Sequence, residues 1–156
     1  MGAGSNRAVA ALLAGVSAGI LSTFAQLLLW AAFGEDALGL LLRDSRLTAA
    51  LVLGHDVLPP PATFDVEVML AATAIHFLLS IFYAAILLPV RRSGLVVSHL
   101  AGAGFGIVLY FINMHGFTAI FPWFAEARGG ITLATHVVFG VAVSMTYQYL
   151  GASRRG

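Results

Sequence analysis

The chain has 156 residues, 60% hydrophobic and 10% charged, whereas soluble domains are about half apolar and about a quarter charged, so an integral membrane protein is predicted. All eight basic residues are arginines scattered along the chain and the net charge is only +1, which excludes a nucleic-acid-binding surface. The lack of cysteine excludes disulfides, thiolate metal sites and iron–sulfur clusters.

Four apolar runs are long enough to cross a bilayer, because a membrane-spanning helix needs about 20 residues. The predicted transmembrane helices cover 8–33, 68–90, 95–114 and 131–150. We expect them to form a single membrane domain over 1–156, an all-α integral membrane protein built as a four-transmembrane-helix bundle. A cleaved signal peptide is the alternative for the first run, but this run exceeds the usual apolar core of about 7 to 15 residues.

The segment 34–67 between the first two spans is predicted to be an outer loop, since acidic residues crowd around a triple proline there. Within it, Asp44 or Ser45 could cap a short helix that ends at Gly54. Such a helix is too short to span the bilayer. We therefore expect an interfacial or re-entrant segment over 45–53.

The loops differ in charge, and this difference predicts their sides of the membrane. Most of the arginines lie at the two termini and in the short turn 91–94. Cytoplasmic loops are enriched in arginine and lysine, so both termini are expected to be cytoplasmic. The loop 115–130 on the opposite side is rich in aromatic residues, which suits the headgroup level of a bilayer.

The first and third spans share a glycine pattern, and the second and fourth each carry a histidine. One offset along the chain superposes three pairs: Gly15 on Gly102, Gly19 on Gly106, and Gln26 on Asn113. The glycines are predicted packing positions, because small residues let helix backbones approach closely. The pattern favours a tandem repeat of two helical hairpins. Chance similarity is the alternative, since glycine is frequent in transmembrane helices.

The candidate site is a polar intramembrane cluster of Gln26, His76, Asn113 and His136, expected to converge in the outer half of the bundle. Ionisable residues inside a membrane are costly and often functional. Three interpretations remain open: hydrogen bonds from the histidines to the two amides, binding of haem or a divalent metal by His76 and His136, and movement of protons or a solute. No spacing of metal ligands within one helix strengthens the second interpretation.

No nucleophile, phosphate-binding or dinucleotide motif occurs in the sequence, so no residue is proposed as catalytic and an enzyme is not favoured. The expected function is that of an accessory or stress-related membrane factor. The alternatives are a haem- or metal-binding membrane subunit and a small oligomeric transporter. The expected partners are the lipid bilayer and either a second copy of the chain or a larger membrane complex.

From the second span onward the sequence resembles the YagU-like family of small bacterial inner-membrane proteins. The shared motifs are IHFLLSIFYA at 75–84, AGA at 101–103, the Phe121-Pro122 pair and ATHVVFG at 134–140. The resemblance implies a multi-pass protein of the bacterial inner membrane with a four-helix body. It also implies an activity that is unsettled for the family, although one member is linked to acid tolerance. The sequence departs from the family pattern at Tyr110, where a histidine is expected.

Overall fold

A computed structural model of the chain describes residues 3–58, 60–89 and 94–152. The described residues form five α-helices: α1 (Ala3–Ala32), α2 (Ala37–Leu53), α3 (Val66–Ile86), α4 (Leu95–Phe111) and α5 (Gly130–Ala152). Shorter helical turns connect them, namely η1 (His55–Val57), the π-helical η3 (Ile112–Gly116), η4 (Phe117–Ala119) and η5 (Pro122–Ala127). The predicted all-α four-helix bundle is confirmed, because four helical segments are long and apolar enough to cross a membrane.

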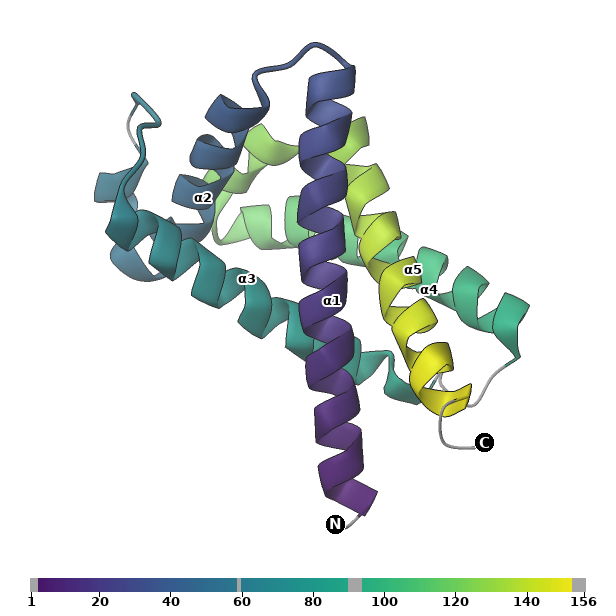
Figure 1. Cartoon of the computed structure of the whole chain (residues 1–156). Helices are drawn as coiled ribbons and strands as arrows, with labels where there is room; N and C mark the ends of the chain where they lie inside the picture. Colours follow the sequence, from purple (N-terminus) through teal and green to yellow (C-terminus); the bar gives the residue numbers. More distant parts are fainter. Residues whose placement is uncertain (1–2, 59, 90–93, 153–156) are drawn as a thin grey trace.

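The helix α1 is the centre of the bundle and packs between α3 and α5 (Figure 1). On one side α2 packs against α3, and on the other side α4 packs against α5. Both chain ends lie at the same end of the molecule, whereas α2 lies toward the opposite end (Figure 1). This placement agrees with an even number of spans.

The predicted spans are close to the observed helices but differ at their ends. The helix α3 ends at Ile86, earlier than the expected end at residue 90, which lies outside the described residues. Pro89 explains the early end, because proline disfavours the helical conformation of the residue before it and lacks an N–H group. The third apolar segment continues beyond the expected residue 114, and the helical stretch reaches Ala119.

The short helix expected within the outer loop, α2, starts earlier than predicted. This helix starts at Ala37, where the Asp36 side chain accepts a hydrogen bond from the Gly39 N–H at 2.9 Å. Asp44 and Ser45, the two expected capping residues, therefore lie inside the helix. The leucine-rich turns after Asp36 are good helix formers, so the helix begins at the earlier capping residue. It ends as expected at Gly54, which has a positive φ of 86°.

The loop between α4 and α5 folds back over the bundle. Its Trp123 indole N–H donates to the Leu47 carbonyl of α2 at 2.9 Å, and the Arg128 Nε–H donates to the Met114 carbonyl at 2.6 Å. The headgroup level expected for this aromatic loop stays a prediction, and the structure adds contacts of the loop with the bundle. Phe117, Phe121 and Phe124 contribute to an internal wall, because α2 offers this loop an apolar surface to pack on.

The first hairpin consists of α1 and α3, and the predicted packing glycines of α1 lie against α3. A Cβ atom on Gly15 would lie only 2.5 Å from Ile81 Cα. A Cβ atom on Gly19 would lie 3.1 Å from His76 Nε2. Only a residue without a side chain allows this approach of α1 to α3.

The second hairpin consists of α4 and α5, and its helices pack in the same register. A Cβ atom on Gly102 would collide with the Gly140 carbonyl, and one on Gly106 would collide with the His136 carbonyl. Thus one glycine of each hairpin lies against the histidine-bearing turn of the partner helix. The relation between the hairpins is not symmetric, however, since α1 packs on α5 whereas α3 and α4 share no comparable interface among the described residues.

Candidate ligand-binding cavity

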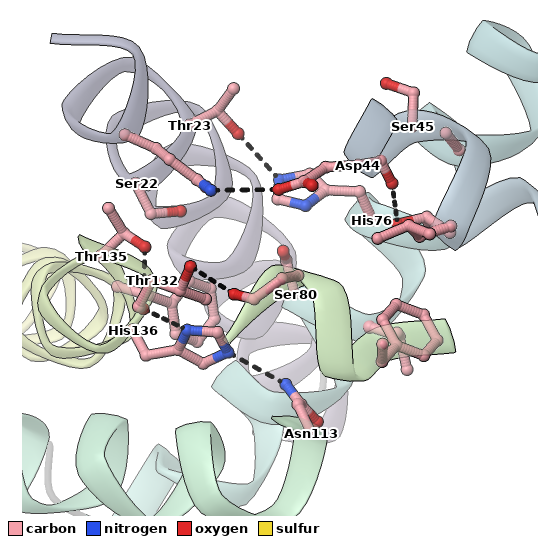
Figure 2. Close-up of a pocket in the computed structure, with 18 of the residues that line it drawn as sticks. Ser22, Thr23, Asp44, Ser45, His76, Ser80, Asn113, Thr132, Thr135 and His136 are labelled. Carbon is pink, nitrogen blue, oxygen red and sulfur yellow. Dashed lines mark hydrogen bonds between the residues drawn. The ribbon is translucent and has the colours of Figure 1, made fainter. Parts of the chain in front are cut away.

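A cavity of about 600 Å³ lies among α1, α2, α3, α5 and the η3–η5 segment (Figure 2). It occupies the half of the bundle that is remote from the chain ends. Toward the chain ends it is closed by core residues, among them Tyr83, Leu109 and Phe139. Beyond them the core is fully buried at Ala14, Ala18, Ala84, Val143 and Tyr147.

Polar groups from every surrounding element reach the cavity, although most of its wall is apolar. The helices contribute hydroxyl, amide, imidazole and carboxyl groups: Ser22, Thr23 and Gln26 from α1; Asp44, Ser45 and Thr48 from α2; Thr73, His76, Ser80 and Tyr83 from α3; Thr132, Thr135 and His136 from α5. Asn113 joins them from the π-helical turn after α4. Turns of this kind are frequent at functional sites.

On one wall the polar groups form a hydrogen-bonded chain with a defined direction. The Tyr83 hydroxyl donates to Asn113 Oδ1 at 2.8 Å. Asn113 Nδ2 lies 3.2 Å from His136 Nε2, and His136 Nδ1 lies 2.7 Å from the Thr132 carbonyl. Because a carbonyl oxygen only accepts, Nδ1 carries the proton of the neutral ring, and Nε2 accepts from the asparagine amide. The chain links α3, η3 and α5.

On the opposite wall, formed by α1, α2 and α3, the polar groups of the described residues form separate pairs and no continuous chain. His76 Nε2 lies 3.4 Å from the Thr23 hydroxyl of α1 (Figure 2). The Gln26 amide does not contact this histidine but donates to Asp44 Oδ2 of α2 at 3.4 Å. A carboxylate is the stronger acceptor, which explains why the amide turns to α2.

Asp44 is held from its other side by Arg43. The Arg43 Nε–H and Nη2–H groups both donate to Asp44 Oδ1, at 2.9 and 2.7 Å. Burial raises the pKa of the Asp44 carboxyl above its ordinary value, and Arg43 partly opposes this shift. The Arg43 side chain itself lines a smaller neighbouring pocket of about 240 Å³.

All four residues of the predicted polar cluster line this one cavity. The structure brings His136 and Asn113 into direct contact, whereas His76 and Gln26 have other partners. Asp44 is the site residue that sequence reasoning missed, since its charged neighbours in the chain are typical of a solvated loop. The sequence does contain a pattern that places Asp44 on one face of a helix. That face consists of residues at helical spacing that all line the cavity, namely Leu41, Asp44, Thr48 and Leu51.

In the described part of the chain, the cavity residues offer no complete ligand set for a divalent metal ion, and haem binding stays a prediction. Both nitrogens of His136 are engaged in the hydrogen-bonded chain, so ligation through Nε2 would displace Asn113. Among the described residues no group of three histidine, aspartate or glutamate side chains is placed to hold a metal ion. Zinc and calcium sites in proteins usually draw on three or more such side chains. We therefore assign no metal chemistry to His76 and His136.

The cavity offers hydrogen-bond donors and acceptors, one carboxylate and several aromatic faces in a largely apolar wall. This combination is typical of sites that bind small molecules noncovalently. Comparisons of the chain with protein-family models, with curated proteins and with solved structures find no match.

Proposed function

We propose that this chain is a multi-pass membrane protein that binds a small lipophilic molecule in the cavity between its two hairpins. One observation carries this proposal: polar groups from α1, α2, α3, α5 and η3 converge on a single apolar cavity of about 600 Å³. Pockets for small molecules have volumes of about 300 to 1,000 Å³ and place a few polar groups in an apolar wall. The protein then acts by binding, as an accessory or stress-related membrane factor.

The distribution of arginine supports a topology for this factor. With both termini cytoplasmic, the cavity lies in the outer half of the bilayer and α2 covers it from the outside. The closely packed core toward the cytoplasmic end supports a binding site that is reached from the outer half rather than a continuous pore. The resemblance to YagU-like proteins supports a bacterial inner-membrane location and a role in stress. Exposed apolar side chains along α4, such as Val96 and Leu100, would contact lipid or the other members of a homo-oligomer or larger complex.

The chain contains a natural pair of reporters for binding. Trp30 is 6% exposed and lines the cavity, whereas Trp123 packs against His55 at a centroid distance of 4.6 Å and is not part of the cavity lining. In lipid nanodiscs, a brominated naphthol should quench the fluorescence of Trp30 in the Trp123→Phe variant with a saturable curve. In the Trp30→Phe variant the remaining Trp123 should show only the gradual quenching that follows partition into lipid.

A matched pair of substitutions tests whether the cavity is responsible. Thr73 lines the cavity, and the neighbouring Ala74 does not. In the Trp123→Phe background, Thr73→Phe should weaken saturable quenching because its ring takes up part of the cavity, whereas Ala74→Phe should leave it unchanged. Equal, non-saturable quenching of both tryptophans would contradict the proposed function.

A further inference from the structure

The charge of the cavity lining is unbalanced. Among the described residues that form it, Asp44 is the only aspartate, glutamate, lysine or arginine. The nearest arginine, Arg43, approaches from the neighbouring smaller pocket and is not part of the lining. A ligand inside the cavity therefore meets the Asp44 carboxylate directly, whereas the Arg43 charge lies outside the lining, on the Oδ1 side of that carboxylate.

The two oxygens of the Asp44 carboxylate have different environments. Oδ1 receives both hydrogen bonds from Arg43, at 2.9 and 2.7 Å. Among the residues that the structure describes, Oδ2 receives only the Gln26 amide, at the long distance of 3.4 Å. Charge-assisted hydrogen bonds of nitrogen to carboxylate are normally about 2.7 to 2.9 Å long. Oδ2 thus keeps most of its capacity to accept a hydrogen bond or to approach a cation.

Aromatic side chains surround the remaining space. Seven of them belong to the lining: Trp30, Phe77, Tyr83, Phe117, Phe121, Phe124 and Phe139. The faces of such rings carry partial negative charge and attract cations, most strongly where water is excluded. An aromatic wall with a single carboxylate is the combination that recognises quaternary ammonium groups and other organic cations.

We propose that the ligand of this cavity is a lipophilic organic cation, such as an amine or quaternary ammonium group on an aromatic or alkyl body, with Asp44 as its counter-ion. The inference rests on the proposed binding function and adds the charge of the ligand. An anionic ligand is disfavoured, because it would face the carboxylate without a compensating arginine in the lining. A neutral ligand would leave Oδ2 without a charged partner.

The test uses two probes of the same shape that differ in charge. One is a naphthylmethyl trimethylammonium ion, and the other is its neutral isostere with a tert-butyl group in place of the trimethylammonium group. Binding is measured by equilibrium dialysis against protein in nanodiscs, with empty nanodiscs subtracted. Wild-type protein should bind the cation at least about tenfold more tightly than the isostere.

Substitutions of Asp44 identify the counter-ion. Asp44→Asn should reduce the preference for the cation over the isostere by about tenfold or more. Asp44→Glu, which keeps the charge, should retain the preference for the cation. Retention of isostere binding by Asp44→Asn also shows that the cavity is still folded.

Cation affinity should depend on pH, because a proton and the cation compete for Asp44. The charged or titratable groups around it are Arg43 on its own helix, Glu126 of η5, and His76 and His136 in the cavity lining. Since burial raises the pKa of Asp44 above its ordinary value of about 3.9, affinity for the cation should increase with pH above that value in the wild type and stay flat in Asp44→Asn. His76→Gln and His136→Gln should each keep this dependence, which separates the titration of Asp44 from that of the two histidines.

The outcomes separate the two proposals. Equal affinity for both probes, or an Asp44→Asn variant that keeps the cation preference, would overturn the inference about charge and leave the binding function intact. A pH dependence that survives in Asp44→Asn but is lost in His76→Gln or His136→Gln would also overturn it. No binding of either probe would overturn the proposed function itself.

Discussion

At the scale of single residues, Asn113 and Gln26 show how one added partner changes a hydrogen bond. Asn113 bridges Tyr83 and His136. Gln26, the equivalent residue in the first hairpin, is drawn instead to Asp44, a carboxylate that has no counterpart in the second hairpin. His76 of α3, the histidine of the first hairpin, consequently bonds to Thr23 of α1. The two walls of the cavity therefore differ although the glycine packing behind them is alike.

The bridge through Asn113 can be measured with a double-mutant cycle. Tyr83→Phe and Asn113→Ala should each destabilise the protein, and the double variant should be less destabilised than the sum because the two groups share one hydrogen bond. Interhelical hydrogen bonds in membranes contribute about 0.6 kcal/mol on average and at most about 1.7 kcal/mol. Unfolding by SDS titration in mixed micelles gives the free energies.

The control for this cycle is Tyr110→Phe. Tyr110 is also buried, but its contacts are ring packing against Phe111, His115 and His136, which phenylalanine preserves. This substitution should therefore change the free energy of unfolding less than Tyr83→Phe does. Additive effects of Tyr83→Phe and Asn113→Ala would mean that the bridge contributes nothing to stability.

At the scale of helices, close approach at glycine decides which surfaces pair. In α4, Gly102 and Gly106 lie against the α5 backbone, whereas a Cβ atom on Gly104 would meet no neighbouring helix within 4 Å among the described residues. The outward side of α4 is apolar and exposed, with Val97 and Leu100 at 60% and 68%. One helix thus carries a close-packing face and a face suited to lipid.

This difference predicts opposite results for identical substitutions. Gly106→Ala places a methyl group into the His136 carbonyl and should destabilise the protein by about 1 to 3 kcal/mol, the usual effect of overpacking. Gly104→Ala adds a methyl group in open space and should be neutral or stabilising by up to about 1 kcal/mol through helix propensity. SDS titration of both variants tests this, and similar losses in both would contradict the packing role.

At the scale of the whole molecule, the helices form a row in the order α2, α3, α1, α5 and α4, with the cavity beside its centre. The closed core lies toward the chain ends and the cavity lies toward α2. If the chain ends are cytoplasmic, α2 and η5 form the outer surface of the protein. Ligands would then enter from the outer half of the membrane.

The absence of cysteine allows this topology to be tested directly. Single cysteines can be introduced at Asp56 in η1 and at Gly94 before α4, both of which are exposed. A membrane-impermeant maleimide should label Asp56→Cys in intact spheroplasts and should label Gly94→Cys only after permeabilisation. The reverse pattern would invert the proposed orientation.

The amino-acid sequence by itself determined the membrane class, the four spans and the packing glycines. These features depend on local properties: a span needs about 20 apolar residues, and a missing side chain marks close helix contact wherever it occurs. The sequence also predicted Gln26, His76, Asn113 and His136 as candidate site residues, because polar groups are conspicuous in apolar helices.

Only the tertiary structure decided which of these groups meet and which residue completes the cavity. Asp44 lies in a segment whose charges resemble those of a solvated loop, and it becomes part of the cavity because α2 packs on α3 and turns it toward Gln26. The aromatic wall likewise depends on the fold of the η3–η5 segment over α2. Such placements arise from contacts between residues far apart in the chain, and local patterns of hydrophobicity and helix propensity carry no information about those partners.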